Sequence, residues 1–270
     1  MFEFRSFSSG SNGNAYLFRT DEGTFMIDAG LSTRRILAYL YDTGVQTSSL
    51  QALFVTHDHK DHAQCVGRLQ IAVKRQGGCL PVYLTEGVLD GIDKNPVIRR
   101  SPDRENVRFI TKGEKVECCG CEITPFNVPH DSVDNVGYFI RYGNSTLTLA
   151  TDVGQITEEL HYYINKTENL ILEANYDEGM LMHGPYPAFL KSRIRGGNGH
   201  LSNRSAAELV FQHREHLRRV WFCHLSENNN TPQHVMQSLD LRFQCEGLQP
   251  NDYFMAEPLP RVVPSKLFSI

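Results

Sequence analysis

The sequence predicts an α/β fold, in which helices alternate with many short strands. Apolar residues gather in brief stretches along the first half of the chain, and each stretch has the length of a strand. Segments with helical spacing lie between these stretches, and no repeat, low-complexity segment or clear linker interrupts the order. Helices distributed among strands favour a layered α/β architecture. With 270 residues, of which 40% are hydrophobic, the chain is long enough for a substantial core.

The expected strands follow one another closely along the chain. Five short strands are expected in the first third, at residues 1–7, 14–20, 23–30, 51–56 and 81–85. Two longer stretches follow at 114–128 and 137–152, and the second contains a turn at Gly143-Asn144. The last expected strands are 169–175 and 219–226.

Capping residues mark the helices between these strands. Ser32 or Thr33 can cap a helix that ends near Gly44 and carries four apolar residues on one face: Ile36, Leu37, Leu40 and Tyr41. A second helix is expected at residues 63–73. Ser205 and Glu208 have capping-box spacing, although Ser202 and Asn203 are earlier start points for that helix. Thr231 and Pro232 form a cap and a first-turn proline ahead of a last helix.

The segment THDHKDH, residues 56–62, carries four potential metal ligands: His57, His59, Asp61 and His62. An apolar stretch that reads as the end of a buried strand precedes it, so the ligands are expected in the turn before a helix. In extended chain, His57 and His59 point to one side, whereas Asp61 and His62 are aimed at a different point. This pattern suits two neighbouring metal ions. The alternative is a metal-free polar loop, but crowded imidazoles repel once protonated and would lack a stabilising partner.

Composition and charge narrow the class of protein. The chain starts MFEFRSF, without a signal peptide, and no apolar run approaches the roughly 20 residues of a membrane span. Seven irregularly placed cysteines indicate a reduced, cytoplasmic protein. Three of them form the cluster CCGC, which we interpret as thiols beside a turn at Gly120, with a zinc site as the alternative. The net charge of −4 argues against a strongly basic nucleic-acid-binding protein, but local patches and metal ions still allow a nuclease.

The THDHKDH segment resembles the HxHxDH signature of the metallo-β-lactamase superfamily. Further stretches resemble that superfamily in the expected order: 8–14 (SSGSNGN), 26–30 (MIDAG), 128–132 (VPHDS), 149–154 (LATDVG), 172–177 (LEANYD), 199–203 (GHLSN) and 223–230 (CHLSENNN). Taken together, they resemble the YycJ/WalJ group, whose relatives are the RNase Z type phosphodiesterases. The resemblance implies a four-layer αββα sandwich with metals at one edge of two packed sheets. It also implies a single domain over residues 1–270, with a Pro-rich C-terminal segment from about 257 that wraps the surface.

The resemblance also assigns ligands for two divalent metal ions, with zinc or manganese expected and iron as a further option. The first ion would be held by His57, His59 and His130, and the second by Asp61, His62 and His224. Asp152 would bridge the two ions. A bridging hydroxide would then attack a phosphodiester. Asp28 would not bind a metal itself but would orient the metal loop, residues 56–62, by contacting its ligands. Five other histidines lack strand-end settings and are interpreted as surface or core residues: His161, His183, His213, His216 and His234.

Catalytic residues are expected beside the metals. In the RNase Z type pattern, the residue matching His200 donates a proton, and Glu173 matches the glutamate that supports it. Asp61 would flank the attacking hydroxide. The alternative is that His200 only packs its turn. Lys191, Arg193 and Arg195 lie just ahead of His200 and are a candidate patch for a nucleic-acid backbone, with a solvated helix face as the alternative.

The resemblance implies an exonuclease that degrades DNA from the 5′ end, and it leaves RNA open as a substrate. A second hypothesis keeps the metals but changes the reaction to that of a glyoxalase-II-like thioesterase or a small-molecule (cyclic) phosphodiesterase. The pairing of His200 with Glu173 favours phosphate chemistry over this alternative. A third hypothesis, a binding protein without activity, is disfavoured by the full ligand set. The sequence leaves the oligomeric state and protein partners open.

Overall fold

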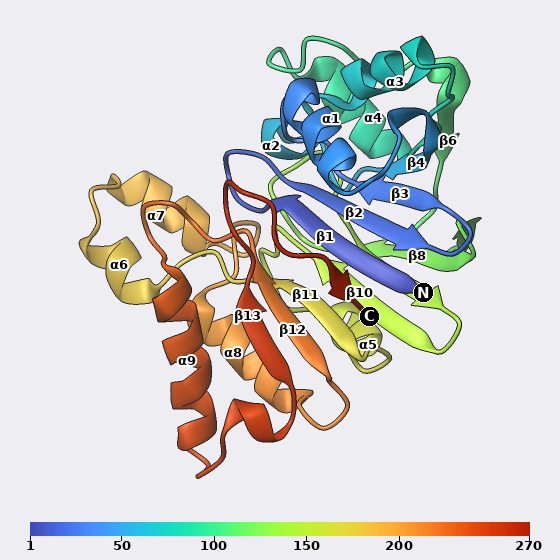
Figure 1. Cartoon of the computed structure of the whole chain (residues 1–270). Helices are drawn as coiled ribbons and strands as arrows, with labels where there is room; N and C mark the ends of the chain where they lie inside the picture. Colours follow the sequence, from blue (N-terminus) through green and yellow to red (C-terminus); the bar gives the residue numbers. More distant parts are fainter.

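The computed structural model describes residues 1–270 and contains two seven-stranded sheets that pack face to face (Figure 1). The first sheet has the strand order β14 (Phe268–Ser269), β1 (Phe2–Ser8), β2 (Ala15–Thr20), β3 (Thr24–Ile27), β4 (Leu50–Phe54), β5 (Val82–Leu84) and β6 (Val107–Phe109). The second has the order β13 (Met255–Pro258), β12 (Arg219–Cys223), β11 (Asn169–Glu173), β10 (Ser145–Ala150), β9 (Val136–Tyr142), β8 (Cys121–Asn127) and β7 (Val116–Cys118). Both sheets mix parallel and antiparallel pairs.

Helices cover the outer face of each sheet (Figure 1). The first sheet is covered by α1 (Thr33–Asp42), α2 (Lys60–Ala63), α3 (Val66–Arg75) and α4 (Glu86–Lys94). The second is covered by α5 (Glu158–Ile164), α8 (Asn203–Gln212) and α9 (Pro232–Gln244), whereas α6 (Glu178–His183) and α7 (Ala188–Arg195) project from one side of the sandwich (Figure 1). Three short 3₁₀ helices complete the chain, at Thr47–Ser49, Arg104–Asn106 and Pro250–Asp252.

Three apolar clusters hold these layers together. One cluster of 21 buried residues lies between the sheets and includes Phe54, Tyr138 and Trp221. A second joins the first sheet to α1, α3 and α4, and a third joins the second sheet to α5, α8 and α9. Because both faces of each sheet are buried, the strands read as apolar runs rather than as alternating patterns. The predicted αββα layering is confirmed.

Each of the nine expected strand ranges contains a strand. The stretch 114–128 forms two strands, because Cys119 and Gly120 adopt positive φ angles of 53° and 72° and form a tight hairpin turn. The stretch 137–152 likewise turns at Gly143, between β9 and β10. Thr231 caps α9 as predicted, with Pro232 in the first turn. The helix α8 starts at the alternative cap, Ser202, whose side chain accepts from the backbone N–H of Ser205, so the Ser205–Glu208 capping box is not formed. Ser32 precedes α1 but makes no side-chain capping hydrogen bond.

The expected helix at 63–73 is divided into α2 and α3, and this prediction was wrong in its boundaries. The backbone N–H of Cys65 donates to the carbonyl of Ala29 at 3.0 Å, so it makes no helical bond to Asp61. The Asp61 carbonyl instead accepts from the backbone N–H of Asn14 at 2.7 Å. Asp61 and His62 therefore lie in a short helix of their own rather than in a turn.

Two other expectations need correction. Tyr41 was expected on the same face of α1 as Ile36 and Leu40, but those two residues are buried whereas Tyr41 is 83% exposed. The Pro-rich C-terminal segment does more than wrap the surface, because β13 pairs with β12 and β14 pairs with β1. Each sheet thus gains an edge strand from the end of the chain.

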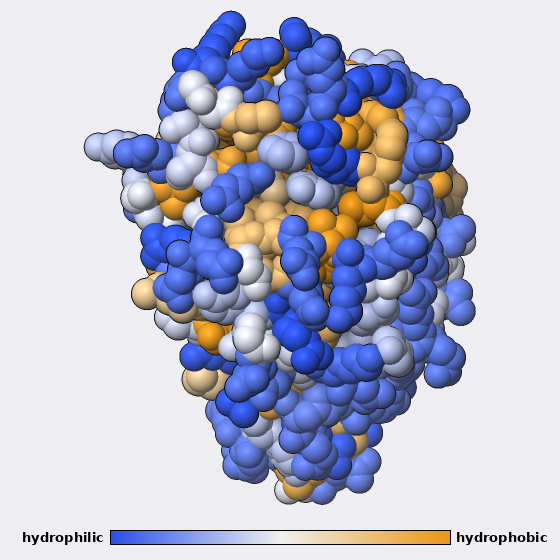
Figure 2. Space-filling model, turned by 90° about the vertical axis from the view of Figure 1, so that its right-hand side faces the viewer, coloured by the Kyte–Doolittle hydropathy of each residue, from blue (hydrophilic) through white to orange (hydrophobic).

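At the opposite edge, the outermost strand of the first sheet is β6 and that of the second sheet is β7, and each has three residues. β6 lies on the right of Figure 1, and Figure 2 views the molecule from that side. Hydrophobic residues gather there in the middle of a largely hydrophilic surface (Figure 2). No helix in the structure has the length and apolar character needed to cross a membrane.

Candidate metal centre

Strand ends from both sheets bring the candidate ligands together at one edge of the sandwich. His57 follows β4 of the first sheet. His130, Asp152 and His224 follow β8, β10 and β12 of the second sheet. The carboxyl ends of strands are where α/β proteins commonly place their sites. Residues that are far apart in the sequence therefore share one site.

Three residues that follow strands at this edge have a strained backbone. Asp28, Asp152 and His224 adopt positive φ angles of 62°, 55° and 54°. This left-handed conformation is uncommon for residues other than glycine and often marks functional sites. Hydrogen bonds hold it in place: the backbone N–H of Asp28 donates to the carbonyl of Phe54 at 2.8 Å. That of His224 donates to Oγ of Ser9 at 2.9 Å.

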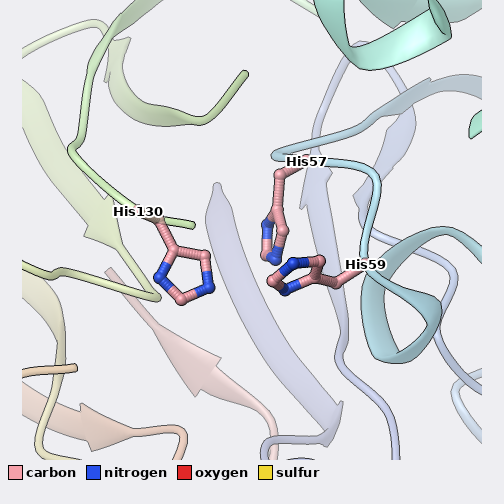
Figure 3. A group of neighbouring side chains, drawn as sticks. All are labelled: His57, His59 and His130. Carbon is pink, nitrogen blue, oxygen red and sulfur yellow. The ribbon is translucent and has the colours of Figure 1, made fainter. Parts of the chain in front are cut away.

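His57, His59 and His130 form one convergent group (Figure 3). Their candidate ligand atoms lie within 4.8 Å of one another. His57 and His59 come from the same loop, and His130 approaches from the second sheet (Figure 3). The Nε2 atoms of His57 and His130 are buried and have no hydrogen-bond partner. Buried polar atoms without partners are rare and call for an explanation.

The neighbours of these rings show which nitrogen carries the proton. Nδ1 of His130 donates to the carbonyl of Gly199 at 2.9 Å, so its Nε2 carries a lone pair. Nδ1 of His57 lies 3.0 Å from the Thr56 hydroxyl. That hydroxyl donates its proton to the Asp28 carboxylate, so the His57 Nδ1–H must donate to Thr56. Both unpartnered Nε2 atoms can therefore accept a cation, which is the donor set that a divalent metal requires.

A second group contains Asp61, His62 and His224. Nε2 of His224 lies 3.4 Å from Oδ2 of Asp61. Nδ1 of His62 donates to Oδ2 of Asp28 at 2.7 Å, which leaves Nε2 of His62 facing the site. Asp28 thus contacts the metal loop from behind.

Asp152 lies between the two groups. Its Oδ2 is 3.1 Å from Nε2 of His62, and its Oδ1 is 3.6 Å from Nε2 of His130. Oδ1 is also 3.4 Å from Nδ1 of His224. A carboxylate placed between two imidazole groups can share its oxygens between two cations.

Burial and the neighbouring charges shift the pKa values of His57, His62 and Asp152 in different directions. Burial, together with the neighbouring His62, holds the pKa of His57 well below its usual range. The neutral ring of His57 can therefore give an electron pair to a cation. Burial also lowers the pKa of His62, but the carboxylates of Asp152 and Asp28 outweigh it and raise that pKa to about 10. Burial disfavours the ionised form of Asp152, but His224 and His62 outweigh it and hold the pKa of that carboxyl well below its usual range. The buried carboxylates therefore attract positive charge, which a proton or a metal ion can supply.

His200 lies next to this cluster and is held by Glu173. Nδ1 of His200 is 2.8 Å from Oε1 of Glu173, and its ring centroid is 5.0 Å from that of His130. Burial lowers the pKa of His200, but the Glu173 carboxylate outweighs burial and raises it above the ordinary value. His200 is therefore a histidine that holds a proton beside the cluster.

A pocket of about 250 Å³ opens over the cluster. It is lined by Ser11, His59, Asp61, Asp131, Asp152, Asn175, Tyr186, Leu190, Arg193, Ile194, Gly199, His200, His224 and Ser226. Of the three cations in the predicted patch, only Arg193 is among these lining residues. Lys191 donates to the carbonyl of Met182 at 2.8 Å, and Nη1 of Arg195 lies 3.5 Å from the sulfur of the same residue. The structure therefore separates Arg193 from Lys191 and Arg195.

Sequence reasoning missed Asp131, which lines the pocket. Its Oδ1 is 3.3 Å from Nε2 of His130 and 3.7 Å from Nε2 of His59. Its Oδ2 accepts from Nε of Arg193 at 2.5 Å. The only signal was its place beside His130 in VPHDS. Tyr186, on the loop between α6 and α7, was also missed, and it carries no pattern that could have identified it.

The cysteine cluster lies apart from this site. The sulfur atoms of Cys118 and Cys119 are 3.5 Å apart beside the hairpin turn at Gly120, and all seven cysteines are free. No cysteine takes part in any group of side chains whose ligand atoms lie close enough together to hold a metal ion. The five histidines interpreted as surface or core residues are also outside these groups. The interpretation of CCGC as thiols beside a turn agrees with this placement.

The αββα fold and the His/Asp cluster define a class of metal-dependent hydrolases, and divalent metal binding follows from both. Residues 24–225 match the beta-lactamase superfamily domain, a span that contains every candidate ligand. The chain belongs to this superfamily.

Curated relatives support the resemblance to the YycJ/WalJ group that the sequence motifs indicated. The sequence is 28% identical to "Exodeoxyribonuclease YycJ" of Bacillus anthracis over 266 residues, which cover 98% of this chain and 97% of that protein. It is 27% identical to "Exodeoxyribonuclease WalJ" of Streptococcus pneumoniae over 230 residues, which cover 85% and 83% of the two chains. The fold is similar to that of the metallo-beta-lactamase fold protein YhfI of Bacillus subtilis. The TM-score is 0.72 at 15% identity, and the match covers 98% of this chain and 100% of that one.

Proposed function

We propose that this chain is a two-metal phosphodiesterase that acts on nucleic acid, as a 5′-to-3′ DNA exonuclease. The observation that carries the proposal is the His200–Glu173 pair, in which His200 lines the pocket over the His/Asp cluster and the buried Glu173 holds its ring. A protonated histidine held by a carboxylate suits proton donation to the leaving oxygen of a phosphodiester. The names of the curated relatives support DNA as the substrate.

The proposed ligand assignment follows the two groups of side chains. His57, His59 and His130 would hold one ion, and Asp61, His62 and His224 the other, with Asp152 between them. Mixed imidazole and carboxylate ligands suit zinc or manganese, and also iron. When bound, two such ions lower the pKa of a water molecule toward about 7 and neutralise phosphate oxygens.

The remaining residues of the pocket would orient the substrate and move a proton. Glu173 holds Nδ1 of His200, so the other ring nitrogen is free to donate its proton to the leaving oxygen. Arg193 lies on the pocket wall, where its guanidinium can contact a phosphate beside the scissile bond. Lys191 and Arg195 lie on the same helix and would contact the strand further out.

Two further features belong to the proposal. Each sheet takes strands from the end of the chain as well as from earlier segments, which supports a single domain over residues 1–270. Seven free cysteines support a reducing compartment, the cytoplasm.

Digestion of end-labelled substrates tests the proposal. Single- and double-stranded DNA and RNA would each be incubated with the protein and added manganese or zinc. We expect mononucleotide release from 5′-labelled DNA at early times and shortening of 3′-labelled DNA. A protein that hydrolyses bis(p-nitrophenyl) phosphate or a glutathione thioester, but no nucleic acid, would contradict the proposal and favour a small-molecule hydrolase.

A further inference from the structure

A second cavity lies between α1 and α3, on the helical layer outside the first sheet. This groove of about 480 Å³ is lined by Thr33, Leu37, Arg68, Ile71, Ala72, Arg75, Gln76 and Arg100. Three of its eight lining residues are arginines, and none is acidic. An adjoining cavity of about 500 Å³ shares Ile71 and Arg100 with it and adds Lys74 and one acid, Asp103. Together the two adjoining cavities carry four cations, Arg68, Lys74, Arg75 and Arg100, against one acid, and we call them the cationic groove.

The cations of this groove are exposed and have no carboxylate partner. Neighbouring cations do find partners: Lys94 pairs with Asp90 at 2.6 Å, and Arg104 pairs with Asp93. Arg68, Arg75 and Arg100 take part in no ion pair and no side-chain hydrogen bond, although the chain has a net charge of −4. Unpaired guanidinium groups with free donors suit phosphate, which they can bind with two parallel hydrogen bonds.

The groove is built rigidly around Gly67. A Cβ atom on Gly67 would lie 2.3 Å from the carbonyl oxygen of Ser101, so only glycine allows this loop to lie against α3. The buried side chain of Gln70 accepts from the backbone N–H of Asp103 at 2.8 Å and donates to the carbonyl of Leu80 at 3.1 Å. The loop that carries Arg100 is therefore fixed beside Arg68, before any ligand binds.

The start of α1 adds a further preference for anions. The first turn of α1 contains no acidic residue, and its N-cap, Ser32, makes no side-chain capping hydrogen bond. Oγ1 of Thr33, which lines the groove, is buried and has no partner. A helix N-terminus carries partial positive charge and unsatisfied N–H groups, so it favours a negatively charged ligand.

The groove begins at the same sheet edge as the metal centre. α1 follows the loop that leaves β3 and carries Asp28, and α3 follows the short helix of the metal loop after β4. The backbone bond from Cys65 to Ala29 ties these two segments together. The helices α1, α2 and α3 lie together in the outer layer of the first sheet (Figure 1).

We propose that this groove binds the phosphate backbone of a nucleic-acid strand at a distance from the scissile bond. The inference rests on the proposed function, and it adds a second contact region that would favour long substrates over short ones. Because the contacts are to phosphates, binding there would be independent of base sequence and would weaken with salt.

The test compares two sets of substitutions. Arg68, Arg75 and Arg100 are changed together to Gln, and a control protein carries Gln at three exposed cations outside the groove: Arg108, Lys166 and Arg218. Hydrolysis is measured on a dinucleotide and on single-stranded DNA of increasing length, with thermal unfolding of each protein. We expect the groove variant to lose about tenfold or more in kcat/KM on long DNA, through KM. Its salt dependence should fall by about 0.7 log units for each lost phosphate contact. A triple Lys variant should retain most of the binding.

The outcomes separate this inference from the proposed function. Normal dinucleotide hydrolysis by the groove variant, with weakened binding of long DNA, supports the groove. Equal losses in the groove and control variants, or unchanged binding of long DNA, would overturn it while leaving the nuclease proposal in place. A wild-type protein that cleaves no nucleic acid overturns both.

Discussion

Oε1 of Glu173 lies 2.8 Å from Nδ1 of His200, and the same oxygen lies 2.9 Å from Nδ1 of His224. The other carboxylate oxygen accepts from the backbone N–H groups of Val153 and Leu201, at 2.8 and 2.9 Å. One buried carboxylate thus connects the proposed proton donor with a proposed metal ligand. It also fixes two loops that enter the site.

All four groups around the Glu173 carboxylate can donate a hydrogen bond to it. No other side chain of the same size can accept all four bonds. In Glu173→Gln, either orientation of the amide places its NH₂ group against two donors. We expect this variant to lose about 1–3 kcal/mol of the free energy of unfolding, which is the cost of unsatisfied buried polar groups. Urea unfolding of the metal-free protein measures it, with the exposed Glu215→Gln as control. Equal stability of the two variants would contradict this role of Glu173.

We expect two divalent ions per chain and complete loss of hydrolysis in Asp61→Ala. The Asp61 side chain is 22% exposed and contacts His224 and His62 rather than the apolar core, so its removal should leave the fold intact. Elemental analysis after loading with excess metal tests the number of ions. The rate of phosphodiester hydrolysis and the thermal unfolding of Asp61→Ala, each compared with the wild type, test the role of Asp61. Lys60→Ala, next along the chain, is the control. A stoichiometry that stays near one, or a variant that keeps most of the rate, would refute the assignment.

His200→Ala should slow the chemical step and keep the metal. Loss of a general acid lowers the rate by about 10²–10⁴-fold. His224→Ala is the matched comparison, because both rings contact the same oxygen of Glu173 but only His224 belongs to the proposed ligand set. Metal content and single-turnover rate are measured on one preparation of each variant. Metal loss from His200→Ala would make His200 a ligand, and an unchanged rate would make it structural.

Much of the fold was predictable because the strands are buried on both faces. Apolar runs such as the one that ends at Phe54 stand out in the sequence, and THDHKDH follows one of them directly. The candidate ligands were assigned through the family resemblance, and His130, Asp152 and His224 gained support from their places at the ends of apolar stretches. Their convergence, however, depends on how two sheets meet, which no local pattern encodes.

Other features depend on contacts that a sequence does not display. The break between α2 and α3 arises from the bond between Cys65 and the carbonyl of Ala29, a residue far earlier in the chain. The helix α7 contains no buried residue, so its apolar pattern is weak. The separation of Arg193 from Lys191 and Arg195 follows from the place of α6 beside that helix, which only the tertiary structure shows.

The cations of α7 should contribute unequally to DNA binding. We expect Arg193→Ala to weaken oligonucleotide binding more than Lys191→Ala combined with Arg195→Ala, because only Arg193 lines the pocket. Each lost phosphate contact should reduce the salt dependence by about 0.7–0.9 log units. Binding is measured across a salt series, and hydrolysis of bis(p-nitrophenyl) phosphate serves as the control for an intact metal centre. Equal losses on both substrates would instead assign Arg193 to the support of Asp131.

The stability of the protein should depend on pH through a histidine far from the metals. His213 is buried directly after α8 and contacts the end of α5: its Nε2 lies 2.8 Å from Nδ1 of His161, and its Nδ1 lies 2.9 Å from Oδ1 of Asn165. Burial, followed by the nearby His161 and His216, lowers the pKa of His213 from 6.5 to about 4. The unfolded chain therefore binds more protons than the folded chain between these pH values, so stability falls as the pH decreases through this window.

His213→Gln should remove this dependence. A difference of this size in pKa corresponds to at most about 3–4 kcal/mol of stability, which is lost between roughly pH 6.5 and pH 4 in the wild type and is absent in the variant. Urea unfolding of metal-free protein at several pH values measures it. The metal centre is the same in both proteins, so its contribution cancels in the difference. His183→Gln, at an exposed position, should behave as the wild type. A variant whose stability falls with acid as steeply as that of the wild type would show that His213 does not titrate in this window.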